Sequence, residues 1–436
     1  YTNPVTGQVF LTDVVGTSNS PDVHGKRTVS SAFAELQIPI ISPEMNIPLV
    51  NKIDVQLAGR AEHYSDVGTV AKPKIAAAWD VIPGFRFRGS YSEGFRAPNL
   101  EQINVTQVSR SNNRQDYIFC EADLRAKRIT SFNACARQQA VQARRAGNPD
   151  LKPETSKSLS YGIVLEPEFI PQAWGHLTLT ADVWKIKQKN IVGVFGEGNS
   201  VIVDYFDRLM GTTNPAVHRA DPTPDQIAAF AGTGLTPAGT ILFADDKYQN
   251  QLPQQAEGVD LGALYRISTD RFGDFGVNIN VTHQRKLYQS PTPAIQELLD
   301  ARAAGKINAL TVITGAAELV GQNGVPGWRG SGTITWRKGP FAADWFTTYT
   351  GKFYSTALTN PDGSFYHVPH TYMHNASVSY TFEDTGRLGG NLDGLTVRLG
   401  ARNIFDKKPP LVSGGYTGSI YNPYGRYWYV DVKKIF

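Results

Sequence analysis

The most regular feature of this 436-residue chain is an alternation of apolar and polar residues with a period of two. The segment 53–62 places Ile53, Val55 and Leu57 on one face and polar residues such as Asp54 on the other. Similar runs occur at 85–92, 177–183, 275–282, 395–402 and 427–436. Successive side chains of a β-strand point to opposite faces, whereas a helix has a period of 3.6. The pattern therefore predicts an all-β protein whose strands have one apolar and one polar face.

The links between these runs are alternately short and long. Short links lie at 82–84, 167–174, 269–273 and 338–340, and the long ones lie at 99–154, 190–253 and 288–327. Long links of roughly 40 to 60 residues on one side and tight turns on the other are typical of outer-membrane barrels. A large secreted all-β protein also alternates, but it does not require this asymmetry. Counting back from Phe436 predicts about 13 or 14 strands of a transmembrane antiparallel β-barrel.

The long links carry helix signals of their own. The stretch 121–146 is rich in Ala and Arg, and the stretches 223–231 and 292–304 both open with Thr-Pro. Proline at the first helical position beside a capping threonine is a common helix start. We therefore expect short helices in the outer loops.

Composition narrows the class of protein. The mean hydropathy is −0.29, and no apolar run reaches the length of about 18 residues that a spanning helix needs. The formal charge is only +4, and the basic residues are dispersed, so nucleic acid is not an expected partner. The chain begins at Tyr1 without a basic and apolar signal segment, and we expect it to be processed or cut there.

The two cysteines, Cys120 and Cys135, lie in one polar segment of a long link. In an oxidising compartment they can close a loop of about 15 residues, which stabilises by roughly 3 kcal/mol. Free buried thiols are the alternative. The sequence leaves both open.

Three motifs resemble those of TonB-dependent receptors. Residues 90–100 read Ser-Tyr-Ser-Glu-Gly-Phe-Arg-Ala-Pro-Asn-Leu, and residues 147–156 read Gly-Asn-Pro-Asp-Leu-Lys-Pro-Glu-Thr-Ser. The third is Ala-Arg-Asn-Ile-Phe-Asp-Lys-Lys-Pro-Pro at 401–410, followed by Tyr-Gly-Arg-Tyr-Trp at 424–428 and a terminal Phe436. In that family the first two flank an outer loop, and the terminal aromatic resembles the signal for barrel insertion. The motifs occur here in the family's order.

The resemblance implies a receptor in the outer membrane of a Gram-negative bacterium. The family fold is a barrel of 22 strands, preceded by a plug domain and a TonB-binding segment (the TonB box). We expect residues 1–436 to form the last 13 or 14 strands, with plug and TonB box outside this chain. The implied partners are TonB, the plug, outer-membrane lipid, lipopolysaccharide and a small nutrient. A complete 14-strand porin is the competing architecture, and a passive porin or adhesion barrel is the alternative function.

An enzyme is not expected. The chain has no Gly-x-Ser-x-Gly, His-Glu-x-x-His or phosphate-cradling Gly-Lys motif. Asp182, Asp344 and His283 are explained by a polar barrel interior. No cofactor is implied.

The only histidine cluster is His367, His370 and His374. Four residues of an extended strand cover roughly 13 Å, so His370 and His374 cannot share a metal in an unbroken strand. We interpret them as interface histidines beside Tyr372 and expect no metal site. Haem receptors of the family carry a ligating histidine between two of the motifs, and this chain has none there, which disfavours haem.

Two sets of residues are candidates for ligand contact. The link 105–147 is basic, which suits an anionic ligand such as a ferric siderophore or lipopolysaccharide phosphates, although a solvated helix face is equally compatible. Aromatic residues of the later links suit stacking on catecholates or sugars, so an oligosaccharide is a second ligand class. The candidate ligand residues are Arg125, Arg128, Arg137, Tyr205 and Tyr248.

The polar strand face predicts a third set. Charged residues there line the barrel interior, where we expect them to contact the plug, line the path or pair with each other. They are Arg60, Glu62, Arg86, Arg88, Arg398 and Arg402.

Overall fold

The computed structural model describes residues 23–105, 108–251, 253–382, 392–411 and 420–434. Fourteen strands form one antiparallel sheet, in which β15 pairs only with β14 and the others follow one another in chain order. The strands along that path are β1 Val29–Ile41, β2 Lys52–Tyr64, β3 Gly68–Ile82, β4 Phe85–Arg96, β7 Glu154–Leu165, β8 His176–Lys189, β13 Gln254–Thr269, β14 Gly273–Gln289, β16 Trp328–Lys338, β17 Phe341–Thr350, β20 Thr371–Thr381, β21 Leu395–Arg402 and β22 Tyr427–Lys434. The short strand β15 is Ala317–Glu318.

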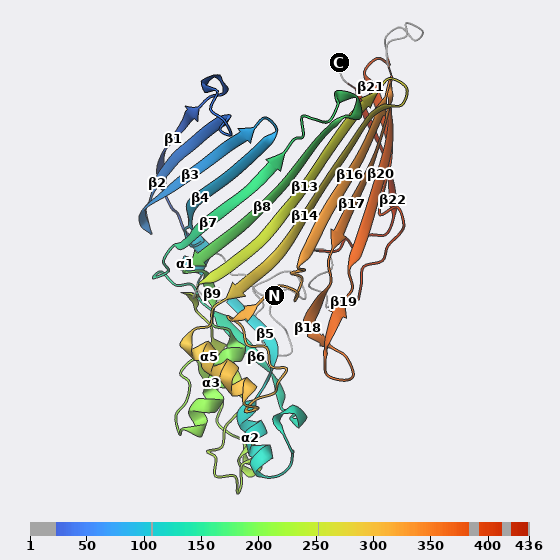
Figure 1. Ribbon diagram of the computed structural model, residues 1–436. Helices are drawn as coiled ribbons and strands as arrows, with labels where there is room; N and C mark the ends of the chain where they lie inside the picture. Colours follow the sequence, from blue (N-terminus) through green and yellow to red (C-terminus); the bar gives the residue numbers. More distant parts are fainter. Residues whose placement is uncertain (1–22, 106–107, 252, 383–391, 412–419, 435–436) are drawn as a thin grey trace.

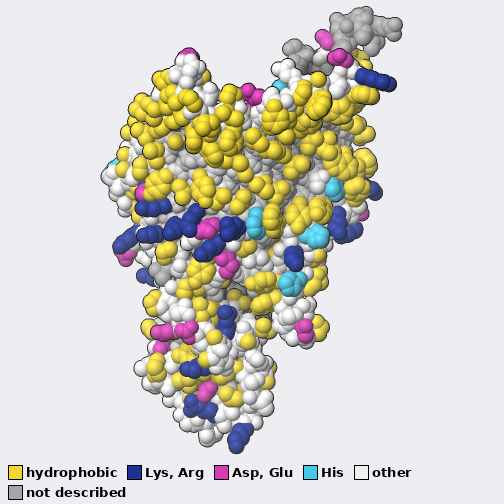
Figure 2. Space-filling model, in the orientation of Figure 1, with side chains coloured by type: hydrophobic (Ala, Val, Ile, Leu, Met, Phe, Trp, Pro, Cys, Tyr) yellow, Lys and Arg dark blue, Asp and Glu magenta, His cyan; other side chains and the backbone are white. Residues whose placement is uncertain are grey.

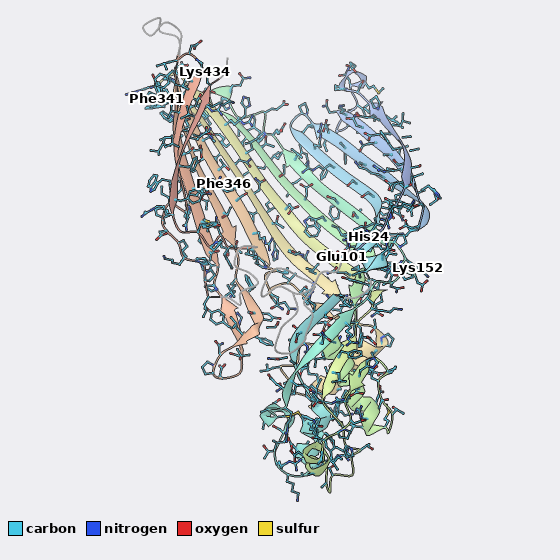
Figure 3. The ribbon with its side chains drawn as sticks, turned by 180° about the vertical axis from the view of Figure 1, so that it is seen from behind. His24, Glu101, Lys152, Phe341, Phe346 and Lys434 are labelled. Atoms are coloured by element: carbon cyan, nitrogen blue, oxygen red, sulfur yellow. A yellow bond between two sulfur atoms is a disulfide. The ribbon has the colours of Figure 1, made fainter. Side chains whose placement is uncertain are left out.

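The sheet curves into a trough rather than a closed barrel (Figure 1). Within the described residues, β1 and β22 are its two edges and do not pair with each other. Tight turns connect strands at one end, where Phe341 and Lys434 lie, and Glu101 and Lys152 lie at the other end (Figure 3). The all-β prediction and the strand number are confirmed, whereas Phe436 lies outside the described residues.

The two faces of the sheet differ in polarity, as the alternation predicts. Leu57 is opposite Leu36 on β1 and Ile75 on β3, and at the other edge of the sheet Leu399 on β21 is opposite Val430 on β22. These side chains are exposed, with Leu57 at 40% and Val430 at 65%. They form a broad hydrophobic band over the outer side of the sheet (Figure 2). An apolar patch of this extent is costly in water and suits contact with lipid.

The long links fold together into a separate unit, the loop domain, which extends from the end of the sheet opposite the tight turns (Figure 1). Four of its strands form a sheet in the order β10-β11-β6-β5, in which β11 and β6 are parallel. Its elements are α1 Leu100–Asn104, β5 Val108–Gln115, α2 Tyr117–Arg125, η2 Phe132–Ala134, β6 Gln138–Arg145, β9 Val192–Val194, α3 Glu197–Leu209, β10 Val217–Arg219, α4 Pro224–Ala229, β11 Ile241–Asp245, β12 Tyr248–Asn250 and α5 Pro293–Ala303.

Smaller elements complete the chain. They are the hairpin β18 Phe353–Thr359 and β19 Phe365–Val368, and the 3₁₀ turns η1 Pro43–Met45 and η3 Gln172–Trp174. No helix in the described part of the chain is both long and apolar enough to cross a membrane.

The loop domain has its own apolar core. Ile118, Ile202 and Leu298 come from three different helices and are almost completely buried. A disulfide joins Cys120 at the end of this core to Cys135 after η2. Among the described residues, the clusters of buried apolar side chains lie outside the strands of the main sheet.

The predicted helices of the links agree with the structure only in part. α4 and α5 begin after Thr223 and Thr292, whose side chains accept the expected capping hydrogen bonds, so these two predictions are confirmed. The stretch 121–146 is not a continuous helix. α2 ends at Arg125, and residues 138–145 form β6, which pairs with β5 and β11. Pairing on both sides outweighs the helix propensity of Ala and Arg.

Candidate functional site

A polar cavity of about 630 Å³ lies in the loop domain where β5, the start of α3 and the segment 308–314 meet. Residues far apart in the sequence form its wall. The polar residues of its lining include Arg114, Tyr117, Glu197, Asn199, Thr311 and Thr314. A concave site with a few convergent polar groups is the usual form of a small-molecule site.

Glu197 organises one side of this cavity. Its Oε1 accepts hydrogen bonds of 2.7 Å from Nη2 of Arg114 and 2.7 Å from Nδ2 of Asn112. The carboxylate is almost buried and lies at the first residue of α3, where the helix dipole favours negative charge. The preceding Gly196 has a φ of 94°, and a Cβ there would lie 2.8 Å from Oγ1 of Thr314. Only glycine therefore allows α3 to start this close to the opposite wall.

Two buried polar atoms of the wall have no hydrogen-bond partner among the described residues. They are Nε of Arg114, a donor, and Oδ1 of Asn199, an acceptor. The Asn199 side chain is fully buried, and its amide group is oriented by bonds from Nδ2 to the carbonyl oxygens of Phe195 and Thr314. Unpaired buried polar groups cost roughly 1–3 kcal/mol each.

Tyr117 forms the floor on the side of α2. Its hydroxyl shares a hydrogen bond with Oγ1 of Thr311, and burial raises the pKa of the phenol, which stays neutral at physiological pH. The cavity thus presents one carboxylate, one guanidinium, an amide and hydroxyls. It can bind a polar ligand by hydrogen bonds, and it has no nucleophile with an adjacent base.

The arginines predicted for ligand contact do not line this cavity. Arg125 pairs with Glu121 at 2.7 Å, and both Arg128 and Arg137 pair with Asp123 at 2.6 Å. Arg137 and then Arg128 hold the pKa of Asp123 below its usual range. Arg128 and Arg137 thereby join the residues after α2 to that helix, whereas the Arg125–Glu121 pair lies within α2.

The two predicted tyrosines are also separated from the cavity wall. Tyr205 is 2% exposed in the core, where its hydroxyl donates to Glu121 at 3.1 Å and burial raises its pKa. Tyr248 is half-buried on β12, which pairs with β9. In this structure the five predicted residues do not form one site. No local sequence pattern predicts that Arg114, Glu197 and Asn199 lie together, because β5 and α3 meet only in the tertiary structure.

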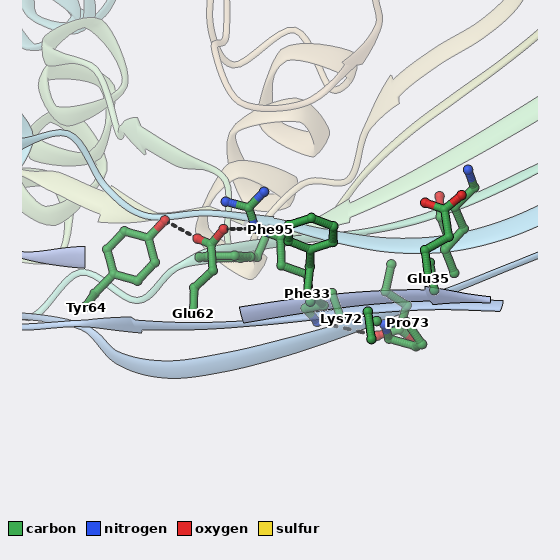
Figure 4. Close-up of a pocket in the computed structure, with 15 residues that line it drawn as sticks. Phe33, Glu35, Glu62, Tyr64, Lys72, Pro73 and Phe95 are labelled. Atoms are coloured by element: carbon green, nitrogen blue, oxygen red, sulfur yellow. Dashed lines mark hydrogen bonds and ion pairs between the residues drawn. The ribbon is translucent and has the colours of Figure 1, made fainter. Parts of the chain in front are cut away.

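The predicted interior residues lie on the polar face of the sheet and are engaged in pairs. Arg60 pairs with Glu62, which also accepts a hydrogen bond from Tyr64 (Figure 4). Arg86 pairs with Asp80 and Arg88 with Asp182, each through two hydrogen bonds. Shallow cavities of about 570 and 620 Å³ lie over these groups.

The last two interior residues lie at the other edge. Arg398 on β21 is opposite Asp431 on β22, and Arg402 lies over the rings of Tyr427 and Tyr429. The polar face therefore carries charge along the whole width of the sheet.

The histidines lie among aromatic rings. His374 stacks on Tyr372 at a ring distance of 6.4 Å, and His370 contacts Tyr349 and Tyr372. Within the part of the chain that the structure describes, no group of three His, Cys, Asp or Glu side chains could hold a metal ion.

The family described as "TonB dependent receptor-like, beta-barrel" matches residues 1–404. The chain belongs to this family of TonB-dependent receptors. The motif at 90–100 contains the end of β4, and the motif at 147–156 leads into β7, with the loop domain's first link between them. No curated protein matches the sequence.

Solved TonB-dependent receptors share the fold. The siderophore receptor PirA of Acinetobacter baumannii is 16% identical with a TM-score of 0.55. The match covers 93% of this chain and 45% of that chain. A ferric enterobactin receptor (PfeA) structure from Pseudomonas aeruginosa is 14% identical with a TM-score of 0.54, and 93% of this chain covers 44% of it. The chain thus spans less than half the length of these receptors. At this identity the likeness concerns the fold alone.

Proposed function

We propose that this chain is part of an outer-membrane receptor of a Gram-negative bacterium that binds a scarce nutrient outside the cell and imports it with energy delivered through TonB. A ferric siderophore is the proposed ligand class. Membership of the TonB-dependent receptor family and the fold shared with siderophore receptors support this proposal. By family membership, TonB and a plug domain are the proposed partners.

The observation that carries the ligand proposal is the polar cavity of the loop domain. Siderophores present many oxygen atoms, which can accept from the partly exposed guanidinium group of Arg114 at the cavity wall. An oligosaccharide offers similar groups and is the second ligand class. Glu197 is already neutralised by Arg114, so the cavity does not require a cationic ligand.

The polar face of the sheet is the proposed path inward or the surface that contacts the plug. Arg60, Arg86 and Arg88 each have a carboxylate partner there. A wall of paired charges offers hydrogen bonds without the strong attraction that would trap an anionic ligand. Arg398 and Arg402 are proposed to serve the same role at the other edge.

The arginines of α2 and its neighbours receive a supporting role in this proposal. Arg128 and Arg137 join the residues after α2 to Asp123, while Arg125 pairs with Glu121 within α2 and donates to the carbonyl oxygen of Thr233. Changing Arg125 to Ala should leave uptake unchanged if the role is only supporting, since Arg125 is partly exposed and its partner Glu121 also accepts from Tyr205. Loss of uptake by a variant that still folds would instead support Arg125 as a ligand-binding residue.

A growth experiment tests the import function. The gene encoding this chain is disrupted in its bacterium, and growth under iron limitation is measured with individual ferric siderophores as the iron source, in strains with and without TonB. We expect one ferric siderophore to stop supporting growth when either the gene for this chain or TonB is disrupted. Uptake that continues without TonB would favour a passive porin, and unchanged uptake of all siderophores and oligosaccharides together with lost surface attachment would favour an adhesion barrel.

A second experiment tests the cavity. Val312 lines the cavity and is 52% exposed, so Val312→Trp should fill the space without removing a buried contact. The matched control is Ile227→Trp, because Ile227 is 49% exposed on α4 and lies outside the cavity lining. We expect ligand affinity to fall at least about ten-fold for Val312→Trp only. Equal affinities for both variants would overturn this site.

A further inference from the structure

The outer face of the sheet changes from apolar to basic at the end nearest the loop domain. Leu159 and Tyr161 on β7 and Val183 on β8 belong to the hydrophobic band, with Tyr161 directly opposite Val183. Lys157 lies on the same face of β7, two residues before Leu159. A row of Lys and Arg side chains is visible directly below the hydrophobic band (Figure 2).

Strand register places several lysines together on this outer face. On β8, Lys185, Lys187 and Lys189 share a face because they are two residues apart. Lys187 is directly opposite Lys157 on β7, and Glu257 on β13 is opposite Lys185. On the next strand Lys286 is also opposite Glu257. We name this group the lysine belt: Lys157, Lys185, Lys187, Lys189 and Lys286.

The lysine belt carries more positive charge than its own carboxylates neutralise. Glu257 pairs with Lys185. Glu93 forms ion pairs with both Lys157 and Lys72, each at 3.4 Å. Lys187 and Lys189 are exposed, and no ion pair joins either to a carboxylate in the described part of the chain. Five lysines therefore face two glutamates.

The direct opposition of Lys157 and Lys187 is unfavourable by itself. Opposite side chains on antiparallel strands have Cβ atoms about 5 Å apart, and like charges in that position destabilise a sheet. An anion between the two ammonium groups would remove the repulsion. Next to these lysines on the same face are Leu159 on β7 and, beyond Lys185, Val183 on β8, which belong to the band proposed to contact lipid.

We propose that the lysine belt binds the phosphate groups of phosphorylated lipids in the membrane leaflet nearest the loop domain. The lipid tails would lie against the hydrophobic band while the phosphates reach the ammonium groups, each of which is a compact charge with three donors. This rests on the membrane location in the proposed function, but not on ligand import. The arginines of the link 105–147 are less suited to this role, because Arg125, Arg128 and Arg137 already have carboxylate partners.

The test measures binding of the purified, detergent-solubilised protein to lipid A and to lipid A from which the phosphates have been removed. The belt variant combines Lys157→Gln, Lys187→Gln and Lys189→Gln. The matched control neutralises three exposed lysines elsewhere, by Lys407→Gln, Lys408→Gln and Lys433→Gln. Each lysine near an anionic lipid surface contributes about a factor of five, so the belt variant should bind phosphorylated lipid A on the order of a hundred-fold more weakly. The control should bind as the unchanged protein does.

A conservative variant separates charge from folding. Arginine at positions 157, 187 and 189 keeps the charge and should keep most of the affinity, even if the glutamine variant folds poorly. Equal binding by the belt variant and the control, or equal binding of lipid A with and without phosphates, would overturn the proposal. Full competition by inorganic phosphate at equal concentration would also overturn it, since the site would then bind free phosphate as well as it binds the lipid.

Nutrient uptake is measured in parallel with these variants. Phosphate-dependent lipid binding without any uptake would refute the import proposal and leave the lysine belt intact. Uptake together with phosphate-independent lipid binding would refute the lysine belt alone.

Discussion

Arg219 lies at the centre of a buried ion-pair network in the loop domain. It donates to both carboxylate oxygens of Asp116, at 2.6 and 2.9 Å, and to Asp204 at 2.9 Å. Arg208 donates to the same oxygen of Asp204. Asp204 is completely buried, and each of these charges is tolerated only because its partners compensate the loss of water.

We expect Arg219→Ala to destabilise the loop domain by about 3–5 kcal/mol, since it leaves two buried carboxylates without their main partner. Arg219→Lys should recover only part of this loss, because one ammonium cannot donate to both carboxylates in the same geometry. Amide hydrogen exchange of α3 and β10 measures the effect. As a control, Arg271→Ala removes an arginine from a sheet turn and should leave exchange in α3 unchanged.

Asp123 gives the loop domain an acid dependence. Arg137 and Arg128 lower its pKa in the folded state. The carboxylate therefore contributes stability above its unfolded pKa of about 3.9, and that stability is lost as the pH falls through the lower folded pKa. We expect Asp123→Asn to be less stable than the unchanged protein at neutral pH and the difference to shrink in acid. Urea unfolding at several pH values measures this, and a constant difference would contradict it.

At the scale of elements, the disulfide joins α2 to the residue after η2. The closed loop has a sequence separation of 15 residues, for which loop-closure entropy gives about 3 kcal/mol. We expect reduction, or replacement of both Cys120 and Cys135 by Ala, to increase proteolysis within residues 116–137 while the main sheet stays resistant. Equal proteolysis of the reduced and oxidised protein would show that the ion pairs of Asp123 suffice.

The main sheet and the loop domain are stabilised differently at this scale. The strands pair with neighbours along the whole sheet, and their apolar side chains remain exposed. The loop domain buries residues of α2, α3 and α5 against one another. Chemical denaturants that weaken apolar burial should therefore affect the loop domain first.

At the scale of the whole molecule, the outer band requires a lipid surround. Ile279 on β14 is 44% exposed in that band, and the next residue, Asn280, lies on the polar face. We expect Ile279→Arg to reduce the free energy of unfolding in a bilayer by about 2–4 kcal/mol, whereas Asn280→Arg should change it little. Unfolding in lipid vesicles by urea measures both. An equal effect of the two variants would contradict the assignment of faces.

The sequence by itself determined the strands and the polarity of their faces, because a period of two is written along each strand and needs no distant partner. The starts of α4 and α5 were equally local, since a capping threonine and the proline that follows it favour a helix start. The resemblance of three motifs also indicated the family that the comparison of residues 1–404 confirmed.

Only the tertiary structure decided which residues meet. Residues 138–145 form a strand because β5 and β11 pair with them, and the cavity exists because Arg114, Glu197 and Thr311 converge from three separate links. The lysine belt likewise depends on the register that places Lys157 opposite Lys187. Such pairings join residues from 23 to 197 positions apart, and no local pattern encodes a partner at that distance.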